Sequence, residues 1–130
     1  MATEKQHILI VEDDIDGCDF LKVLFDMDGY QTTTACTIAE AEQLLQQERF
    51  DLYLLDTKLP DGSGIDLCRQ IRVLNGDCPI VFYSGDAFPK DKELAIASGA
   101  QAYIVKPTDI LVLEKTVATL IQKSKSGRAN

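Results

Sequence analysis

Four short apolar stretches of the sequence each end in polar side chains whose types suit phosphate and metal chemistry. The stretches end in the acid pair Glu12 and Asp13, in Asp56, in Ser84 and in Lys106. Carboxylates are oxygen ligands that Mg²⁺ takes together with water and phosphate oxygens, and a lysine supplies a point positive charge to a phosphoryl group. Because the three acids come without a second base, the sequence indicates Asp56 as a nucleophile and the other groups as its supports.

These side chains can act together only if the fold brings the ends of the apolar stretches to one place. Five β-like runs, at 7–11, 30–35, 51–55, 79–83 and 101–105, alternate with helical patterns. This alternation is typical of βαβ units and a parallel sheet. Ligands bind such sheets in the crevice at the carboxyl ends of the strands. We therefore expect one shared site at that edge of the sheet.

Apolar residues recur at helical spacing between the predicted strands. A fourth helix is expected over 91–97, stopping at Gly99, and a fifth over about 108–123, with Thr108 or Asp109 as its cap. The first three helical patterns consist of Ile15, Cys18, Leu21, Leu24 and Phe25, then of Ile38, Ala41, Leu44 and Leu45, and then of Ile65, Cys68, Ile71 and Leu74.

Glycines mark the ends of several of these elements. Gly29, Gly76 and Gly99 each follow a predicted helix, where a glycine adopts the left-handed conformation without a steric penalty. The segment 62–64 is interpreted as a glycine-containing turn that leads into the third helix rather than as a phosphate cradle.

Length, composition and charge narrow the class of protein. The 130 residues, 45% of them apolar, predict one globular domain over 1–123, followed by a polar tail over 124–130. The net charge of −8 argues against direct nucleic-acid binding, because phosphate backbones select basic surfaces. The N-terminus lacks the apolar region of a signal peptide, and no apolar run approaches the roughly 20 residues that span a membrane. We therefore expect a cytoplasmic protein that does not contact the membrane.

The cysteines and the single histidine carry no chemical motif. Cys18, Cys36, Cys68 and Cys78 show no C-x-x-C spacing, so we expect free thiols that serve as small apolar residues. His7 opens the first apolar run without ligand partners at helical spacing, and we interpret it as a partly buried residue at a strand end.

The order of the motifs identifies a family. After the acid pair come a D-x-x-L-P-x-x-x-G run that begins at Asp56, a hydroxyl at Ser84 after the fourth strand, and the dipeptide Lys106-Pro107 after the fifth. Together these motifs resemble the receiver domain of response regulators, from about Gln6 to Lys123. The resemblance implies a flavodoxin-like, doubly wound (βα)5 fold with a five-stranded parallel sheet in the strand order 2-1-3-4-5.

The resemblance implies roles for the residues around Asp56. Asp56 would accept a phosphoryl group from a phosphohistidine on a sensor histidine kinase or a histidine phosphotransfer protein. Mg²⁺ would be bound by Asp13 and Asp56, by Glu12 through water, and by the backbone carbonyl of Lys58. We assign Asp14, the third acid in the row, to the start of the first helix, where the helix dipole favours a carboxylate.

The resemblance also implies a switch. Lys106 would pair with the phosphoryl group, next to a cis peptide bond at Pro107. Ser84 would move to donate to a phosphoryl oxygen, and Tyr103 would fill the space that this movement leaves. The alternative is that Tyr103 simply packs at the sheet edge. In the switch interpretation, phosphorylation changes the 4-5-5 face, which is formed by the fourth helix, the fifth strand and the fifth helix.

A receiver of this kind is a signalling phosphoacceptor rather than an enzyme, and it catalyses at most its own phosphorylation and dephosphorylation. Its output would go to a partner protein or a fused output domain, or it would relay phosphate between histidines. The sequence fits both a stand-alone receiver and a piece of a longer regulator or hybrid kinase. A dimer formed through the last helix is compatible with it.

Three other functions fit less well. A haloacid-dehalogenase-like phosphatase also uses an aspartate nucleophile with Mg²⁺, but it requires a second aspartate two residues later, where this chain has Lys58. A degenerate receiver that binds partners without phosphorylation would not need Asp13, Asp56, Ser84 and Lys106 all to be present. A flavin protein of similar architecture would need an aromatic loop to enclose the ring, and none is evident.

Overall fold

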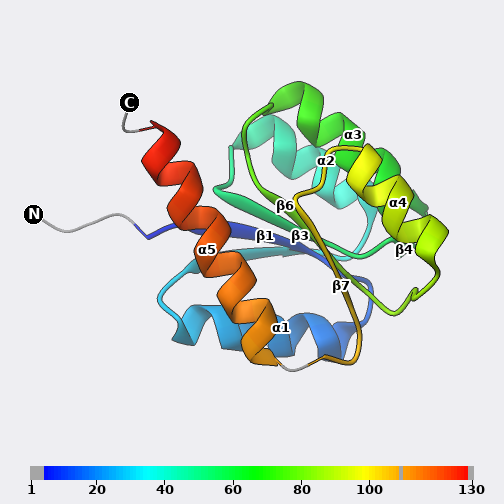
Figure 1. Cartoon of the computed structure of the whole chain (residues 1–130), viewed down its shortest axis with the longest axis horizontal. Coiled ribbons are helices and arrows are strands. Elements are labelled where there is room, and N and C mark those ends of the chain that lie inside the picture. The colour runs from blue at the N-terminus through cyan, green and yellow to red at the C-terminus, as the bar shows by residue number, and fades with distance from the viewer. Residues whose placement is uncertain (1–4, 109, 129–130) are drawn as a thin grey trace, which may run out of the picture.

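The computed structural model describes residues 5–108 and 110–128. At its centre lies a five-stranded parallel sheet in the order β2-β1-β3-β6-β7 (Figure 1), which confirms the predicted fold and strand order. The strands form where the sequence has its apolar or β-branched runs. They are β1 (His7–Val11), β2 (Gln31–Ala35), β3 (Leu52–Leu55), β6 (Ile80–Ser84) and β7 (Ala102–Val105).

Five helices cover the two faces of the sheet. Helices α1 and α5 pack on one face, and α2, α3 and α4 pack on the other (Figure 1). Each face has its own apolar core, which explains why β1 and β3 are apolar at nearly every position. The helices are α1 (Ile15–Met27), α2 (Ile38–Gln47), α3 (Gly64–Leu74), α4 (Pro89–Ala97) and α5 (Ile110–Arg128).

The register of the central strands determines which strand ends lie next to each other. Val11 at the end of β1 lies opposite Ala35 of β2 and Leu55 of β3. The backbone N–H of Glu12 donates to the carbonyl of Ala35, and that of Asp56 donates to the carbonyl of Val11, both at 3.0 Å. The acids that follow β1 and β3 are therefore held at the same edge of the sheet by backbone hydrogen bonds.

The structure differs from the sequence-based expectation in a few elements. The segment around 62–64 is not a simple turn, because β4 (Lys58–Leu59) and β5 (Gly62–Ser63) form a short antiparallel pair. The predicted end of the last helix at 123 is wrong, since α5 continues to Arg128; straight-chain residues such as lysine and arginine lose little rotamer freedom in a helix. Asp109, one of the two predicted caps of that helix, lies outside the described residues.

Two apolar positions and one glycine also differ from the expectation. Ile15 and Leu74 follow the helical pattern but are exposed at the ends of their helices. Gly29 and Gly99 have the positive φ angles predicted for them, whereas Gly76 does not. Helix α3 instead ends at Leu74 with Asn75 as its cap, whose backbone N–H bonds to the carbonyl of Ile71.

The cysteines are free thiols and His7 is a partly buried residue at a strand end, as expected. All four cysteines are free thiols, and Cys18, Cys68 and Cys78 are buried. His7 lies at the start of β1, where its ring contacts Thr33 and Glu48. Within the described part of the chain, no helix is both long and apolar enough to cross a membrane.

Gly64 lets helix α3 begin directly against the backbone of Asp56. A Cβ at this position would lie 1.8 Å from the Asp56 carbonyl oxygen, far inside van der Waals contact. The N–H of Gly64 donates to the carbonyl of Thr57 at 2.8 Å. The last glycine of the D-x-x-L-P-x-x-x-G run is therefore required by close packing beneath the site.

Replacing Gly64 with alanine is expected to lower the free energy of unfolding by about 2 kcal/mol or more, because the new methyl group must displace the Asp56 backbone. Urea denaturation followed by circular dichroism measures this change. The matched control is Gly76→Ala, whose Cβ would make an ordinary contact at 3.8 Å. Equal stabilities for the two variants would contradict the packing argument.

Candidate functional site

Three carboxylates gather at the carboxyl edge of the sheet. Glu12 and Asp13 directly follow β1, and Asp56 directly follows β3. One oxygen atom from each of the three lies within 4.8 Å of the others. Glu12 is buried, Asp56 is partly buried and Asp13 is exposed. The acids that the sequence analysis grouped together are thus brought together by the fold.

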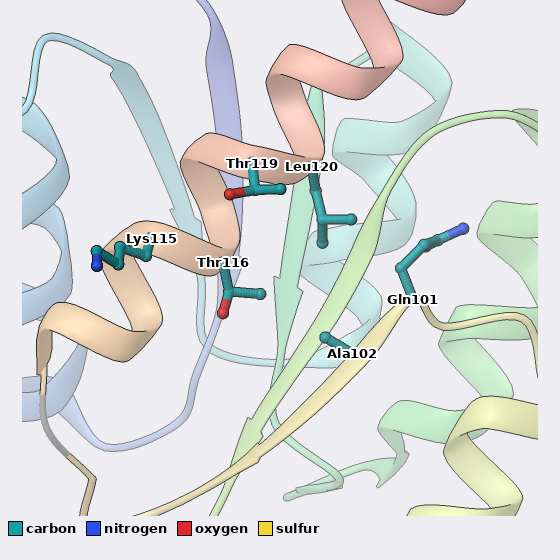
Figure 2. A pocket seen from close by; sticks show the side chains of 6 residues that line it. All are labelled: Gln101, Ala102, Lys115, Thr116, Thr119 and Leu120. Atoms are coloured by element: carbon teal, nitrogen blue, oxygen red, sulfur yellow. The ribbon is translucent and has the colours of Figure 1, made fainter.

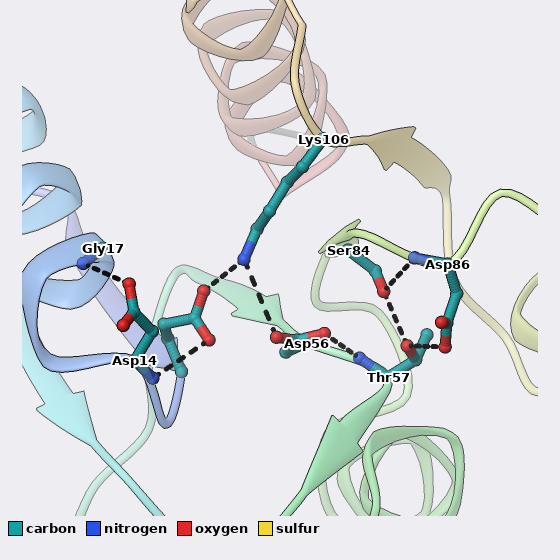
Figure 3. Close-up of polar contacts among 8 residues, drawn as sticks. Asp14, Gly17, Asp56, Thr57, Ser84, Asp86 and Lys106 are labelled. Atoms are coloured by element: carbon teal, nitrogen blue, oxygen red, sulfur yellow. Dashed lines mark hydrogen bonds and ion pairs between the residues drawn. The ribbon is translucent and has the colours of Figure 1, made fainter.

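Lys106 follows β7 and extends its ammonium group between two of these acids (Figure 3). Its Nζ forms an ion pair with Glu12 Oε1 and lies 3.7 Å from Asp56 Oδ2. The ring of Tyr83 lies beneath the ammonium at 5.2 Å from the ring centroid, a distance suited to a cation–π contact. The Lys106–Pro107 peptide bond is cis, as the resemblance implied.

Three carboxylates and one ammonium leave this cluster with an excess of negative charge, and burial and neighbouring charges shift the pKa values of Glu12 and Lys106. Burial raises the pKa of the Glu12 carboxyl; Asp56 adds to the rise and Lys106 opposes it. Burial would lower the pKa of the Lys106 ammonium, but Glu12 and Asp56 outweigh that effect and the pKa is raised. Both groups therefore hold their protons more tightly, Glu12 chiefly because it is buried and Lys106 because it lies beside two carboxylates.

A divalent cation would relieve this excess of negative charge. The three carboxylates offer only oxygen atoms, which suits a hard cation such as Mg²⁺ better than a metal that prefers nitrogen or sulfur ligands. The acidic cluster fits the Mg²⁺ expected from the sequence in both ligand type and charge.

Hydroxyl groups lie on the other side of Asp56, away from Lys106 (Figure 3). Ser84, the last residue of β6, is buried, and its Oγ lies 2.6 Å from Thr57 Oγ1. Thr57 Oγ1 also donates to Asp86 Oδ2 at 2.9 Å. The backbone N–H of Asp86 donates to Ser84 Oγ at 3.1 Å. Ser84 is therefore hydrogen-bonded to Thr57 and Asp86.

Tyr103 is buried in the structure. Its ring stacks on Phe82 with the centroids 5.9 Å apart, and its hydroxyl donates to the backbone carbonyl of Asp86 at 2.7 Å. Burial raises the pKa of the Tyr103 phenol, and the nearby hydroxyls of Ser84 and Thr57 oppose that rise. The Tyr103 ring is therefore buried in the same structure in which Ser84 is hydrogen-bonded to Thr57.

Asp14 and Lys58, which the sequence analysis also discussed, lie near the acidic cluster. Asp14 caps α1 by accepting a hydrogen bond from the Gly17 N–H at 2.9 Å. Lys58 lies in β4, and its exposed ammonium is 3.4 Å from Asp86 Oδ1. Its side chain therefore pairs with an acid at the rim of the site.

Sequence reasoning missed two residues of this arrangement, Thr57 and Asp86. Thr57 directly follows Asp56, and Asp86 comes two residues after Ser84. Both are polar residues just beyond a strand end, so the criterion that selected Asp56 and Ser84 could have selected them too. Their contact with each other could not be read from the sequence, because it joins loops that are 29 residues apart.

An apolar hollow lies away from these residues, between the start of β7 and the side of α5 that faces it (Figure 2). It is open to solvent and contains none of the acids described above. It lies on β7 and α5, which are parts of the 4-5-5 face predicted from the sequence. Its lining residues are Gln101, Ala102, Lys115, Thr116, Thr119 and Leu120.

The comparison with protein families decides which class this site belongs to. Residues 8–118 match the family described as the response regulator receiver domain. The chain belongs to this family. Receiver domains are the phosphoacceptor domains of two-component signal transduction, and this chain is accordingly a signalling phosphoacceptor domain rather than an enzyme.

Curated relatives and solved structures agree with this assignment. The chain is 34% identical over 126 residues to the response regulator SaeR of Staphylococcus epidermidis, covering 95% of the chain and 54% of SaeR. It is 36% identical over 107 residues to the DNA-binding response regulator MtrA of Mycobacterium tuberculosis, covering 82% of the chain and 46% of MtrA. The chain thus spans about half the length of these two relatives.

Among solved structures, a CheY-like receiver domain protein from Methanospirillum hungatei superposes with a TM-score of 0.91 at 28% identity, with 95% of this chain and 99% of that one covered. The non-phosphorylated HemR receiver domain from Leptospira biflexa superposes with a TM-score of 0.84 at 35% identity, with 90% and 94% covered.

Asp56→Asn is expected to raise the free energy of unfolding of the metal-free protein by about 1 kcal/mol at neutral pH, because it removes one of three carboxylates that repel each other. Urea denaturation in EDTA measures this gain. Added Mg²⁺ should then stabilise the wild type more than the variant. Asp77→Asn, which removes an exposed acid before β6 at the opposite edge of the sheet, should show neither effect. Destabilisation of metal-free Asp56→Asn would contradict the charge argument.

The raised pKa of Glu12 predicts how stability depends on pH. Its ordinary value is 4.5, so the folded protein binds this proton more tightly than the unfolded chain does. The stability due to this group is present below pH 4.5 and is lost as the pH rises through the raised pKa. In metal-free protein, Glu12→Gln should therefore gain stability over wild type as the pH rises above 4.5. A difference that does not change with pH would count against the raised pKa.

Proposed function

We propose that this domain is a phosphorylation-controlled signalling switch in which Asp56 accepts a phosphoryl group from a phosphohistidine of a partner protein. The observation that carries the proposal is the position of the Asp56 carboxylate, at a strand end, within 4.8 Å of the other two acids and 3.7 Å from the Lys106 ammonium. The donor is a sensor histidine kinase or a histidine phosphotransfer protein, as the family assignment suggests.

The transfer exchanges one phosphorus bond for another. A carboxylate oxygen of Asp56 attacks the phosphorus, the new O–P bond forms, and the P–N bond to the donor histidine breaks with its electron pair leaving on the nitrogen. Thr57 N–H donates to Asp56 Oδ1 at 2.7 Å, which leaves Oδ2 as the oxygen that faces Lys106. Phosphoryl transfer of this kind needs positioning and charge neutralisation more than covalent help.

In our proposal, Lys106 and a metal ion held by the acids together neutralise the charge of the phosphoryl group. Lys106 is already held between Glu12 and Asp56, so in our proposal its ammonium can shift to a phosphoryl oxygen without a long movement. Mg²⁺, bound by Asp13 and Asp56, by the backbone carbonyl of Lys58 and by Glu12 through water, would supply the remaining positive charge to the phosphoryl oxygens.

The product carries a group with a charge of about −1.5 to −2 and three acceptor oxygens, by analogy with other phosphorylated side chains, in place of the single negative charge of the Asp56 carboxylate. In our proposal the Ser84 hydroxyl turns to one of these oxygens. Tyr103 is tied to the same loop through its bond to the Asp86 carbonyl, so a rearrangement of that loop reaches β7. This is the step that would convert phosphorylation into a change of surface.

The surface that would change is the face formed by α4, β7 and α5. Helix α4 is weakly anchored, because Ala95 is the buried residue of the helix and its N-terminus has no side-chain cap. Phe88 precedes it and is 70% exposed. A helix with so few buried contacts can be shifted at low cost. We propose that a partner protein, a second copy of the chain or a fused output domain senses this face.

The wider setting follows from the family. MtrA is a DNA-binding response regulator by name, and the chain covers about half of it, so we propose that the receiver acts within a longer regulator or on a separate target, and does not itself contact nucleic acid. A cytoplasmic location agrees with the four free cysteines, since thiols persist in reducing compartments.

Incubation with phosphoramidate, whose P–N bond is like that of phosphohistidine, tests the proposal. Intact mass spectrometry should show one added phosphoryl group on wild type and on the control Asp77→Asn when Mg²⁺ is present. EDTA and Asp56→Asn should each abolish the adduct. Labelling of Asp56→Asn at the wild-type rate, or an unlabelled wild type, would overturn the assignment.

A further inference from the structure

Thr57, Ser84 and Asp86 form a closed ring of hydrogen bonds beside Asp56. Asp86 N–H donates to Ser84 Oγ at 3.1 Å, Ser84 Oγ lies 2.6 Å from Thr57 Oγ1, and Thr57 Oγ1 donates to Asp86 Oδ2 at 2.9 Å. Thr57 and Ser84 are buried. Water therefore has little access to the two hydroxyls, and the ring determines where their protons lie.

The direction of the ring follows from counting protons. A carboxylate paired with the Lys58 ammonium accepts hydrogen bonds and donates none. Thr57 has one hydroxyl proton, and it goes to Asp86. The contact between the two hydroxyls must then use the proton of Ser84, with Thr57 as acceptor. The single proton of Ser84 is thus directed toward Thr57.

This assignment matters because Ser84 needs that proton to bind a phosphoryl oxygen. We propose that Thr57 and Asp86 are positioning residues that keep the Ser84 hydroxyl turned away from Asp56 and that compete with the phosphoryl group for its proton. The inference rests on the proposed phosphoacceptor function. If Ser84 must leave Thr57 to reach the phosphoryl group, the free energy of breaking the Ser84–Thr57 hydrogen bond opposes the switch.

Asp86 connects this ring to the rest of the switch. One carboxylate oxygen pairs with Lys58 and the other accepts from Thr57, while its backbone carbonyl accepts from Tyr103. The Asp86 carboxylate orients the two hydroxyls, and its carbonyl holds the Tyr103 ring inward. Release of Ser84 from the ring is therefore coupled to β7 through a single residue.

Binding of beryllium fluoride, a stand-in for the phosphoryl group on a carboxylate, tests the inference on the whole chain with Mg²⁺ present. Thr57→Val removes the competing hydroxyl without changing charge. It should tighten binding about two- to tenfold, the value of one net hydrogen bond, as measured by titration with fluorine NMR. Thr57→Ser keeps a hydroxyl and should bind as tightly as wild type.

A double-mutant cycle separates this role from a structural one. In the Ser84→Ala background, Thr57→Val should leave the affinity for beryllium fluoride unchanged, because the Ser84 hydroxyl proton is absent. Unchanged or weaker binding by Thr57→Val, or a gain that persists in Ser84→Ala, would overturn the inference. If Thr57→Val does not fold, Asp86→Ala takes its place in the same cycle, since it frees the Thr57 proton to go to Ser84. A wild type that binds no beryllium fluoride would instead refute the proposed function.

Discussion

The surplus of carboxylate over ammonium at the carboxyl edge of the sheet is the constraint around which the rest of the structure is arranged. Glu12 is buried with its charge, which is costly unless a cation accompanies it, and Lys106 is the cation that the fold supplies. Asp13 and Asp56 then add negative charge that Lys106 cannot balance alone. Parallel strands make this crowding unavoidable, because their carboxyl ends lie side by side. The repulsion favours the binding of a cation at the site, and that cation can then offset the negative charge of an incoming phosphoryl group.

Much of this could be predicted from the sequence, because each feature has a local cause. The apolar runs that became β1 and β3 are buried on both faces, so nearly every position is apolar and the strands are easily recognised. Glu12, Asp56 and Lys106 stood out because a charge just after such a run is rarely structural. The order of these motifs along the chain predicted the family and the strand order.

The features that could not be predicted from the sequence depend on contacts between distant segments. The close approach of Gly64 to the Asp56 backbone depends on how α3 enters the fold. The contact between Thr57 and Asp86 joins two loops, and its geometry decides where the Ser84 proton points. The buried position of Tyr103 depends on the Asp86 carbonyl, which accepts a hydrogen bond from its hydroxyl. No local pattern predicts that acceptor.

The central claim is that Asp56, rather than a neighbouring acid, carries the phosphoryl group. Reduction of the phosphorylated chain with borohydride converts an aspartyl phosphate to homoserine, and peptide mapping then locates it. Our account predicts homoserine at position 56, with Glu12 and Asp13 unchanged. Conversion at Glu12 or Asp13 in place of Asp56 would show that the cluster accepts phosphate at a different carboxylate and would contradict the account.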